Sequence, residues 1–548
     1  MEEDPVLSRI GNFGKWQARR ISVVQLVGFF TAWQMLVVSF IVPEIEFWCS
    51  PPGLDIPRGE KVNWTSPVIV NNKKSTYDEC KMFDLEYKTT TTLSDVNQSS
   101  VTECSRWDYA RDVYPETVVS QFNLVCGNDK WRSLSQSIYM FGIMVGAVGS
   151  GILSDMFGRK KVTMLASVGI VVFGIAVSFS PNIAIFTFLR WCIAVCSVSC
   201  FTCGYVYCME IIGGKWCTYV GIGLEFPWAL GYMSLPLVAW IFPTWSHLQL
   251  AVTIPVLLLS VLLAIPGLVP ESPRWLLVRG HREQAEDILA KASDMNGRRT
   301  SVVNVAAKTS NESEKEVKSS TLLDLFLTPC MRRSTLIMYY LWFTNSFVYY
   351  GLTLNSGSLI PGDLHINFVI GGALEILAYI LTILAFLYAG RRISMSVSML
   401  IGGVALLLTP AVSSVAWKAV LAQLGKFAIT GSFAMVYVYA AEIFPTVVRN
   451  VGLGSSSMCA RVGSIIAPYI GRELGRTSPA APVIIFGVTS VLAGILVLLL
   501  PETKDTKLPD TMAQGEEFNK EFGGFSGLRK KKEEISNINT FSQDIDMK

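Results

Sequence analysis

The chain has 548 residues, of which 51% are hydrophobic and only 16% are charged, and its formal net charge at pH 7 is +3. A soluble globular protein carries about 25% charged residues, so this composition indicates a membrane protein. The small net charge and the lack of a basic patch interleaved with aromatic residues argue against a nucleic-acid partner.

Twelve stretches of mainly apolar sequence are long enough to cross a bilayer, because a helix rises about 1.5 Å per residue and the hydrocarbon core is about 30 Å thick. We therefore expect an all-α membrane protein. The predicted helices cover residues 21–42, 134–155, 162–180, 183–208, 218–240, 247–269, 334–354, 366–388, 394–411, 416–440, 452–471 and 481–500. No cleavable signal peptide is expected, since the first apolar stretch is itself long enough to span.

Both termini are expected on the same side of the membrane, because the number of spans is even. Basic residues gather on that side, before the first span, in the short turns 159–161 and 391–392, and in the tail run 529–532. An excess of Lys and Arg marks cytoplasmic segments, so we expect both termini in the cytoplasm.

The long loop 43–131 then lies outside the cell. It holds four cysteines, Cys49, Cys80, Cys104 and Cys126. An even number of extracellular cysteines predicts two disulfides, and three pairings remain open. The sequons at Asn63 and Asn97 predict glycosylation at both asparagines.

Two further polar segments are expected inside. The loop 270–333 is charged, and amphipathic spacing over 282–292 predicts a helix within it. The tail beyond Asp505 is expected to be disordered. Six cysteines between Cys192 and Cys217 lie in continuously apolar sequence without His, which favours packing residues over a metal site.

The two halves of the chain repeat at an offset of 231–232 residues. Three matches are in phase: 206–211 with 438–443, 158–160 with 390–392, and 270–271 with 501–502. A parallel repeat of six plus six helices describes major facilitator transporters, whose substrate site lies between the halves near the midplane. The expected parts are a cytoplasmic N-terminus 1–20, a first half 21–269, a linker 270–333, a second half 334–500 and a cytoplasmic tail 501–548.

Four motifs sharpen this fold prediction. They are Gly-Ile-Leu-Ser-Asp-Met-Phe-Gly-Arg-Lys at 151–160, Pro-Glu-Ser-Pro-Arg-Trp-Leu at 270–276, Gly-Lys-Phe at 425–427 and Ala-Glu-Ile-Phe-Pro-Thr-Val-Val-Arg-Asn at 441–450. With the two long loops, they closely resemble the organic cation, anion and zwitterion (carnitine) transporter family of the major facilitator superfamily, from residue 10 to about 510. The resemblance implies facilitated or coupled transport of small organic ions across the plasma membrane.

Charged residues near the cytoplasmic ends of helices are expected to control gating. Gly158 permits a tight turn, and Asp155 is expected to act as a latch that holds one conformation of the halves. The second copy has Leu387 where the acid would be, which predicts a weaker latch. The full predicted gating set is Asp155, Gly158, Arg159, Arg190, Glu210, Glu271, Arg274, Glu442 and Arg449; for Arg190 a packing role is equally open.

Ionisable residues inside spans are costly and usually functional, and here they indicate the charge of the substrate. The resemblance implies that cation carriers have acids at the positions of Glu375 and Arg461, whereas anion carriers have a basic residue at the second position and a Lys at that of Tyr379. This chain combines the acid Glu375 with Tyr379 and the base Arg461. That combination resembles the carnitine-type branch, although Leu377 replaces the usual proline after the acid.

A zwitterion fits this mixture, because an ammonium needs a carboxylate or aromatic faces and a substrate carboxylate matches a guanidinium. Two alternatives remain open: a Glu375–Arg461 salt bridge with no substrate role, or such a pair that exchanges partners on binding. The predicted substrate-binding residues are Glu375, Arg461, Tyr349, Tyr350, Tyr379, Trp342, Asn345, Lys426 and Glu225.

Three functions compete at this stage. The first is import of a small zwitterion such as carnitine, a betaine or β-alanine; the second is polyspecific transport of organic cations; the third is a transport-dead receptor or scaffold. No phosphate-binding glycine loop suggests ATP, and no nucleophile–base arrangement suggests an enzyme, so no cofactor is expected. The coupling ion is left open.

Overall fold

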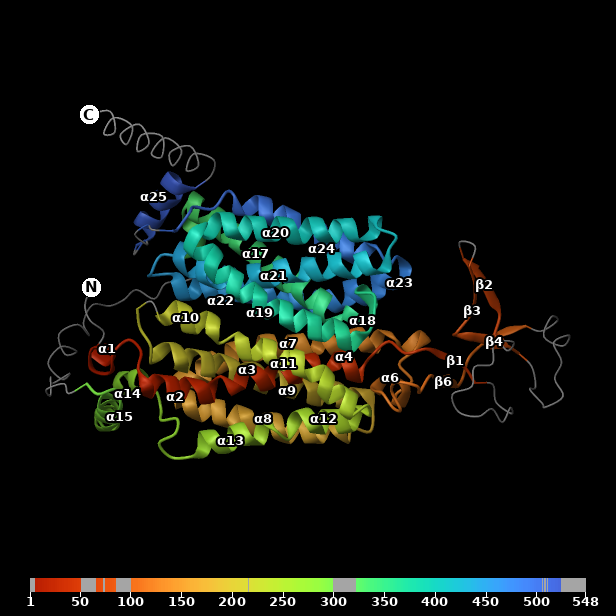
Figure 1. Ribbon diagram of the computed structural model, residues 1–548, viewed down its shortest axis with the longest axis horizontal. Coiled ribbons are helices and arrows are strands. Elements are labelled where there is room, and N and C mark those ends of the chain that lie inside the picture. Colours follow the sequence, from red (N-terminus) through yellow and green to blue (C-terminus); the bar gives the residue numbers. More distant parts are fainter. Residues whose placement is uncertain are drawn as a thin grey trace, which may run out of the picture.

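Two helical bundles lie against each other along their length in the computed structural model (Figure 1). The structure describes residues 5–50, 66–71, 74–84, 100–214, 216–298, 322–504, 506, 509 and 511–523. The predicted glycosylation sites Asn63 and Asn97 lie outside these residues. The strands lie at one end of the molecule, called the loop end below; α1 (Pro5–Ile10) lies at the opposite end, called the tail end.

The first bundle, called the N-half, holds the six spans predicted from the first part of the chain. Its helices are α2 (Lys15–Val24), α3 (Leu26–Leu36) and α4 (Val38–Ile41) for the first span, then α7 (Lys130–Phe157), α8 (Arg159–Ser178), α9 (Ile183–Glu210), α10 (Trp216–Gly223) with α11 (Phe226–Ile241), and α12 (Trp245–Thr253) with α13 (Val256–Ala264). The second span thus begins at Lys130, four residues earlier than predicted. The fifth and sixth predicted helices are each interrupted, at 224–225 and at 254–255.

The second bundle, called the C-half, repeats this arrangement. Its helices are α17 (Pro329–Leu354), α18 (Ser356–Leu359), α19 (Leu364–Tyr388), α20 (Arg391–Leu408) with η4 (Thr409–Ala411), α21 (Val415–Ile443), α22 (Arg449–Tyr469) continued by the π-helical turn η5 (Ile470–Leu474) and α23 (Gly475–Thr477), and α24 (Ala481–Val497). Among the described residues, nine helical segments are long and apolar enough to cross a membrane. The more polar α17 and α22 and the shorter α24 take the places of the predicted seventh, eleventh and twelfth helices.

The halves share apolar packing as well as having cores of their own. One buried cluster fills the N-half and a second fills the C-half. A third combines Tyr139 and Met140 of α7 with Phe347 of α17 and Phe486 of α24. This shared cluster, together with the packing of α7 on α22 and of α11 on α19, joins the bundles.

Short antiparallel strand pairs build the loop end. The strands are β1 (Phe47–Cys49), β2 (Val68–Asn71), β3 (Lys74–Tyr77), β4 (Lys81–Phe83), β5 (Val101–Glu103) and β6 (Trp107–Tyr109), paired β1–β6, β2–β3 and β4–β5, and the short helix α6 (Val118–Gln121) and the turn η2 (Cys126–Asn128) follow them. The register sets Cys49 opposite Trp107 and Lys81 opposite Glu103, which brings the four cysteines together. Of the three pairings that the sequence left open, Cys49–Cys104 and Cys80–Cys126 form.

At the tail end, short helices lie at the ends of the bundles. They are α1, α14 (Pro273–Val278), α15 (Arg282–Met295), α16 (Asp324–Leu327) and α25 (Met512–Phe522). Helix α15 confirms the helix expected over 282–292. Asn296, which follows α15, accepts a hydrogen bond from the Trp16 N–H (2.9 Å) and donates one to the Ile10 carbonyl (2.8 Å), and so ties the linker to the N-terminal segment.

The expectation of disorder throughout the tail is wrong for α25. A capping box between Thr511 and Gln514 starts this helix. Glu516 then accepts hydrogen bonds from the backbone N–H groups of Cys330 (3.1 Å) and Met331 (3.2 Å) at the start of α17. Burial alone would raise the pKa of Glu516, but the hydrogen bonds that it accepts outweigh this effect and lower the pKa. The helix therefore forms because its own cap and its docking on α17 both stabilise it.

Peptide mapping of the unreduced protein tests the disulfides. We expect fragments in which Cys49 is linked to Cys104 and Cys80 to Cys126, with the cysteines of α9 recovered as free thiols. A reduced sample serves as the control. Recovery of either of the other two pairings would contradict this arrangement of the strands.

Candidate functional site

A carboxylate caps the start of the third span at the tail end. Glu271 Oε1 accepts hydrogen bonds from the backbone N–H groups of Arg159 (2.8 Å) and Lys160 (3.0 Å), the first residues of α8. The negative charge suits the positive end of the helix dipole. Gly158 has φ +105°, and a Cβ there would lie 2.3 Å from Glu271 Oε2, so only glycine fits.

The Arg159 side chain connects this cap to two further acids. Its Nε and Nη2 donate to Glu210 Oε1 (3.0 and 2.8 Å), and its Nη1 pairs with Asp155. The Asp155 side chain is nevertheless 70% exposed. The backbone carbonyl of Asp155 accepts a hydrogen bond from Trp275 Nε1 (2.8 Å). Among the described residues, the acid predicted to act as a latch contacts Arg159 of its own half and Trp275 and Arg279 of the linker.

The C-half repeats this geometry. Glu502 caps α20 by accepting from the N–H groups of Arg391 (2.9 Å) and Arg392 (3.2 Å), and the Arg391 guanidinium binds Glu442 at 3.1 Å. Gly390 has φ +87°, with Glu502 Oε2 2.9 Å from the position of a Cβ. The sequence repeat thus encodes the same capping arrangement in both halves. An acid that follows the sixth span caps the third span, and an acid that follows the twelfth span caps the ninth.

Three other predicted gating residues make contacts of their own. Arg190 is buried within α9, with its guanidinium 4.5 Å from the centre of the Tyr139 ring. Arg449 donates to the Phe444 carbonyl (3.3 Å) at the start of α22. Arg274 lies close to Cys217 in α10. Arg190 thus packs against an aromatic ring of α7.

Polar contacts across the loop end join the halves, and the sequence analysis missed them. Arg476 pairs with Asp129 at 2.6 Å, and Asp129 is 2% exposed. Ser133 donates to Glu473 Oε1 (3.0 Å), and Ser137 donates to the Ile465 carbonyl (2.7 Å). All these bonds connect α7, or the residue before it, with the end of α22 and the turns that follow, so they hold the two halves together at the loop end.

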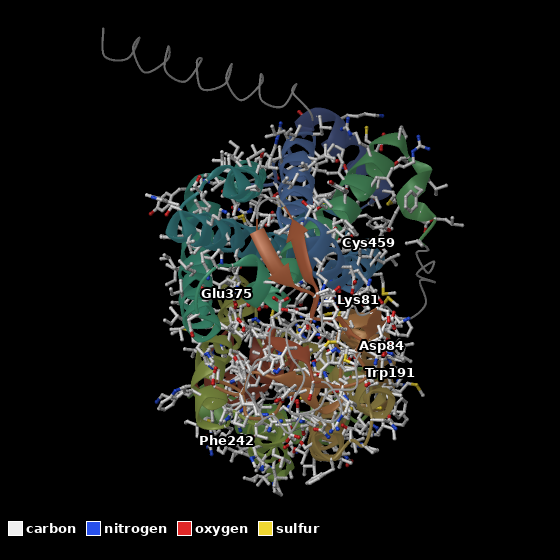
Figure 2. The ribbon with its side chains drawn as sticks, turned by 90° about the vertical axis from the view of Figure 1, so that its right-hand side faces the viewer. Lys81, Asp84, Trp191, Phe242, Glu375 and Cys459 are labelled. Carbon is white, nitrogen blue, oxygen red and sulfur yellow. A yellow bond between two sulfur atoms is a disulfide. The ribbon has the colours of Figure 1, made fainter. Side chains whose placement is uncertain are left out.

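A buried polar cluster lies between the halves near the middle of the spans. Glu375 of α19 is labelled in Figure 2; its Oε1 accepts a hydrogen bond from the Tyr349 hydroxyl (2.9 Å) and lies 3.7 Å from Lys426 Nζ. Lys426 of α21 also donates to the hydroxyl of Tyr232 and lies 3.9 Å above the centre of its ring. Tyr232 belongs to α11, so this cluster spans both halves. The ion partner of Glu375 is therefore Lys426, and the alternative of a Glu375–Arg461 salt bridge is wrong for this conformation.

Two further charges border this cluster. Arg461 of α22 is half-buried; its side chain hydrogen-bonds with Tyr350, and its buried Nε has no partner among the described residues. Glu225 is half-buried at the interruption between α10 and α11 and lies close enough to Glu375 for the two carboxylates to interact electrostatically. Two acids and two bases therefore converge where the halves meet.

Aromatic rings surround these charges. The ring centroids of Tyr349 and Tyr350 are 5.1 Å apart, and Tyr379 meets Phe226 of the N-half at 6.0 Å. Trp342 packs edge-on against Tyr437 at 4.4 Å and is only 1% exposed. Asn345 is fully buried, and its amide nitrogen donates to the Leu341 carbonyl of its own helix (2.9 Å). Of the predicted aromatic set, Trp342 therefore lies in the second layer, behind Tyr437.

Two helices bring further aromatic residues, not predicted from the sequence, to this cluster. Trp228 and Tyr232 follow Glu225 at spacings of three and seven, and Tyr437 follows Lys426 at eleven. These spacings place each aromatic residue on the same helix face as a charge. Trp228 Nε1 donates to the Tyr349 hydroxyl (3.2 Å), another contact between the halves. The helical periodicity around each intramembrane charge was the signal that would have found them.

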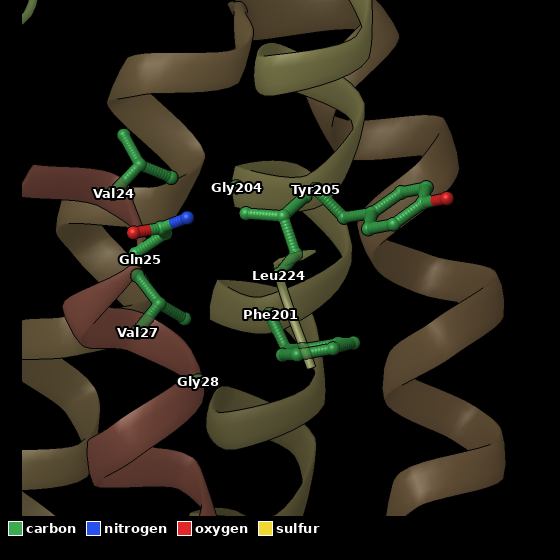
Figure 3. Close-up of a pocket in the computed structure, with 8 residues that line it drawn as sticks. All are labelled: Val24, Gln25, Val27, Gly28, Phe201, Gly204, Tyr205 and Leu224. Carbon is green, nitrogen blue, oxygen red and sulfur yellow. The ribbon is translucent and has the colours of Figure 1, made fainter. Parts of the chain in front are cut away.

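A small pocket adjoins the interruption in the fifth span (Figure 3). Its walls include Gln25, Gly28, Tyr205 and Leu224, and its volume of about 10 Å³ has room for about one water molecule. Tyr205 lies close enough to Glu225 for an electrostatic interaction. Among the described residues no group of three or more His, Cys, Asp or Glu side chains could hold a metal ion. The site consequently offers charges and aromatic faces to a small organic ion.

The cap formed by Glu271 can be tested by substitution. Glu271→Ala removes charge-assisted hydrogen bonds to two backbone N–H groups, which should lower the stability by about 2 kcal/mol. We expect a lower melting temperature of the detergent-purified protein, with exposed Glu283→Gln on α15 as the control. An unchanged melting temperature for Glu271→Ala would contradict the capping role.

The Glu375–Lys426 pair predicts non-additive effects. Glu375→Gln or Lys426→Met alone leaves the other charge buried without its partner, which costs roughly 3–5 kcal/mol. The double variant leaves neither charge, so we expect it to recover most of the melting temperature and folded yield that each single variant loses. Losses that simply add in the double variant would show that the two side chains do not form a pair.

Comparison with known proteins agrees with this architecture. Residues 62–512 match the family described as "Sugar (and other) transporter". The chain is 34% identical to the "Organic cation transporter protein" of Drosophila melanogaster over 534 residues, which cover 95% of each chain. It is 34% identical to "Solute carrier family 22 member 3" of Rattus norvegicus (98% of this chain, 99% of that protein) and 33% identical to "Organic cation/carnitine transporter 2" of Homo sapiens (93% of each).

Solved structures resemble the fold. The inward-open xylose transporter XylE of E. coli aligns with a TM-score of 0.61 and 18% identity, over 92% of this chain and 99% of that one. At this identity the likeness establishes the shared fold alone. The prediction of an all-helical major facilitator architecture is thereby confirmed.

Proposed function

The chain belongs to the organic cation and carnitine transporters of solute carrier family 22 within the major facilitator superfamily, and we propose that it carries a small zwitterion across the plasma membrane. The substrate would bear an amine and a carboxylate, as carnitine, betaines and β-alanine do. As a member of this family the protein is a multi-pass secondary transporter and not an enzyme.

The lack of an ion partner for Arg461 among the described residues is the observation that carries the proposal. Glu375 and Lys426 already neutralise each other, whereas Arg461 forms no ion pair among the described residues and has a buried Nε without a partner. A guanidinium binds a carboxylate through two parallel hydrogen bonds, and a purely cationic substrate would only be repelled by it. A carboxylate on the substrate supplies the missing partner.

Acids and aromatic rings would receive the other end of the substrate. Glu225 and Glu375 are the available carboxylates, and Tyr349, Tyr350 and Tyr379 supply faces on which an ammonium gains a cation–π attraction. The printed name of the human relative mentions both organic cations and carnitine, which agrees with a substrate that has a cationic end.

The contacts at the two ends support alternating access. We place the loop end outside and both termini in the cytoplasm, following the positions of the disulfides and of the basic turns. The bonds from Asp129 and Ser133 to the C-half then close the outer side, as in an inward-facing carrier. The two capped networks at the tail end are rigid parts of each half that would move as units.

Polyspecific transport of organic cations is the second candidate function. Two acids close to each other among aromatic rings favour it, because such a site attracts cations of many shapes. Arg461 argues against it, since a cation carrier gains nothing from an unpaired guanidinium. A coupling ion would be a further partner under either function.

Uptake by transfected cells tests the proposal. We expect labelled carnitine to enter, and we expect Arg461→Ala to raise its KM by roughly tenfold or more, because a charge-assisted hydrogen bond contributes about 1.5–3 kcal/mol. Arg461→Lys should rescue part of this loss. Arg282→Ala, on the exposed face of α15, is the matched control.

Tetraethylammonium is the discriminating second substrate. If it enters, its KM should not rise in Arg461→Ala. Equal losses for tetraethylammonium and carnitine would assign Arg461 a structural role, and entry of tetraethylammonium without competition from any carboxylate-bearing compound would favour the cation carrier.

A further inference from the structure

We propose that Glu225, rather than Glu375, receives the ammonium of the substrate, so that a bound zwitterion bridges the two halves from Glu225 to Arg461. This inference rests on the proposed function and assigns each end of the substrate to one half of the carrier. Four features of the structure carry it.

The first feature is the interruption of the fifth span. Helix α10 ends at Gly223 and α11 begins at Phe226, and Glu225 occupies the break without using its side chain to cap the new helix. Gly28 of the first span approaches closely; a Cβ there would lie 3.5 Å from the Leu224 carbonyl oxygen. The backbone stays helical through the break, but Pro227 has no N–H to donate to the Gly223 carbonyl, so the regular helical hydrogen bond to that carbonyl is absent next to Glu225.

The second feature is the difference between the two acids. Glu375 is 1% exposed and is held by Tyr349 and Lys426. Glu225 is half-buried, and among the described residues its carboxylate has neither an ion pair nor a side-chain hydrogen bond. An unpaired carboxylate within a span is costly, and a substrate ammonium would remove that cost. Binding at Glu375 would first require the ammonium to displace Lys426.

The third feature is the aromatic lining between Glu225 and Arg461. Tyr350 of α17 and Tyr437 of α21 each lie close enough to interact electrostatically with both charges. Tyr205 of α9 also lies near Glu225. A molecule with its ammonium at Glu225 and its carboxylate at Arg461 would therefore lie along the tyrosines, whose faces favour the cationic end.

The fourth feature is that these two charges belong to different halves. Glu225 lies in the N-half and Arg461 in the C-half, and each lacks an ion partner among the described residues. A zwitterion neutralises both at once and links the halves, whereas a simple cation neutralises only Glu225. Zwitterion binding would thus favour the conformation in which the halves approach each other around the substrate, and the carrier would select for molecules that carry both charges.

The test uses the full-length carrier in proteoliposomes, with labelled carnitine and labelled tetraethylammonium. Glu225→Gln removes the charge but keeps the shape of the side chain. We expect it to raise the KM for carnitine by roughly tenfold to a hundredfold, as expected for loss of a charged hydrogen bond, and to raise the KM for any tetraethylammonium transport too. Glu225→Asp should recover part of the carnitine affinity.

The matched comparison is the double variant Glu375→Gln/Lys426→Met, which removes the buried pair without leaving an isolated charge. Under our assignment Glu225→Gln has the larger effect on the KM for carnitine. A larger effect of the double variant, with near-normal KM in Glu225→Gln, would overturn the assignment and make Glu375 the amine site, while leaving the proposed function intact. A wild-type carrier that moves tetraethylammonium but no zwitterion would instead refute the proposed function.

Folding defects can be separated from binding defects with the purified protein. We expect carnitine to raise the melting temperature of the wild-type carrier. Glu225→Gln should have a ligand-free melting temperature equal to or above that of the wild type, because it removes an unpaired charge, but should lose the increase with carnitine. Full stabilisation of Glu225→Gln by carnitine at wild-type concentrations would overturn the assignment.

Discussion

The cost of burying ionised side chains between two apolar bundles governs the centre of this molecule. Four charged residues from four spans, Glu225, Glu375, Lys426 and Arg461, converge where the halves meet, and two of them, Glu375 and Lys426, are almost fully buried. Glu375 and Lys426 meet this cost by pairing, with Tyr349 and Tyr232 as additional hydrogen-bond partners. Glu225 and Arg461 have no ion partners among the described residues, and in our proposal this imbalance gives the site a preference for a ligand with two opposite charges.

Charged and polar contacts at the ends of the spans are of two kinds, those within one half and those between the halves. At the tail end, Glu271 and Glu502 cap helices within their own halves, at glycine turns where no other residue fits. These contacts are independent of how the halves are arranged. The bonds of Asp129 to Arg476 and of Ser133 to Glu473 join different halves, so they must break when the loop end opens. Under the proposed alternating access, these polar contacts between the halves change, whereas the two caps move with their own halves.

Sequence alone predicted the framework because hydropathy and the repeat are local or periodic signals. The capped turns at Arg159 and Arg391 could be matched by their common offset before any contact was known. The pairing of Lys426 with Glu375 could not be predicted from the sequence, because it depends on how α19 packs against α21. The disulfide pairing also required the strand register at the loop end, and α25 required its docking on α17. The aromatic residues of α11 were accessible in principle, since they repeat at helical spacing from Glu225.

The central claim is that the substrate must carry a carboxylate as well as an amine. Glycine betaine and choline provide the most direct measurement, since they share a trimethylammonium head and differ in having a carboxylate or a hydroxymethyl group. Their ability to drive counterflow of labelled carnitine in proteoliposomes containing the wild-type carrier can be compared at equal concentrations. We expect betaine to exchange with carnitine and choline to be weaker by at least roughly tenfold, the loss expected when the guanidinium has no carboxylate to bind. Equal exchange by choline would contradict the central claim.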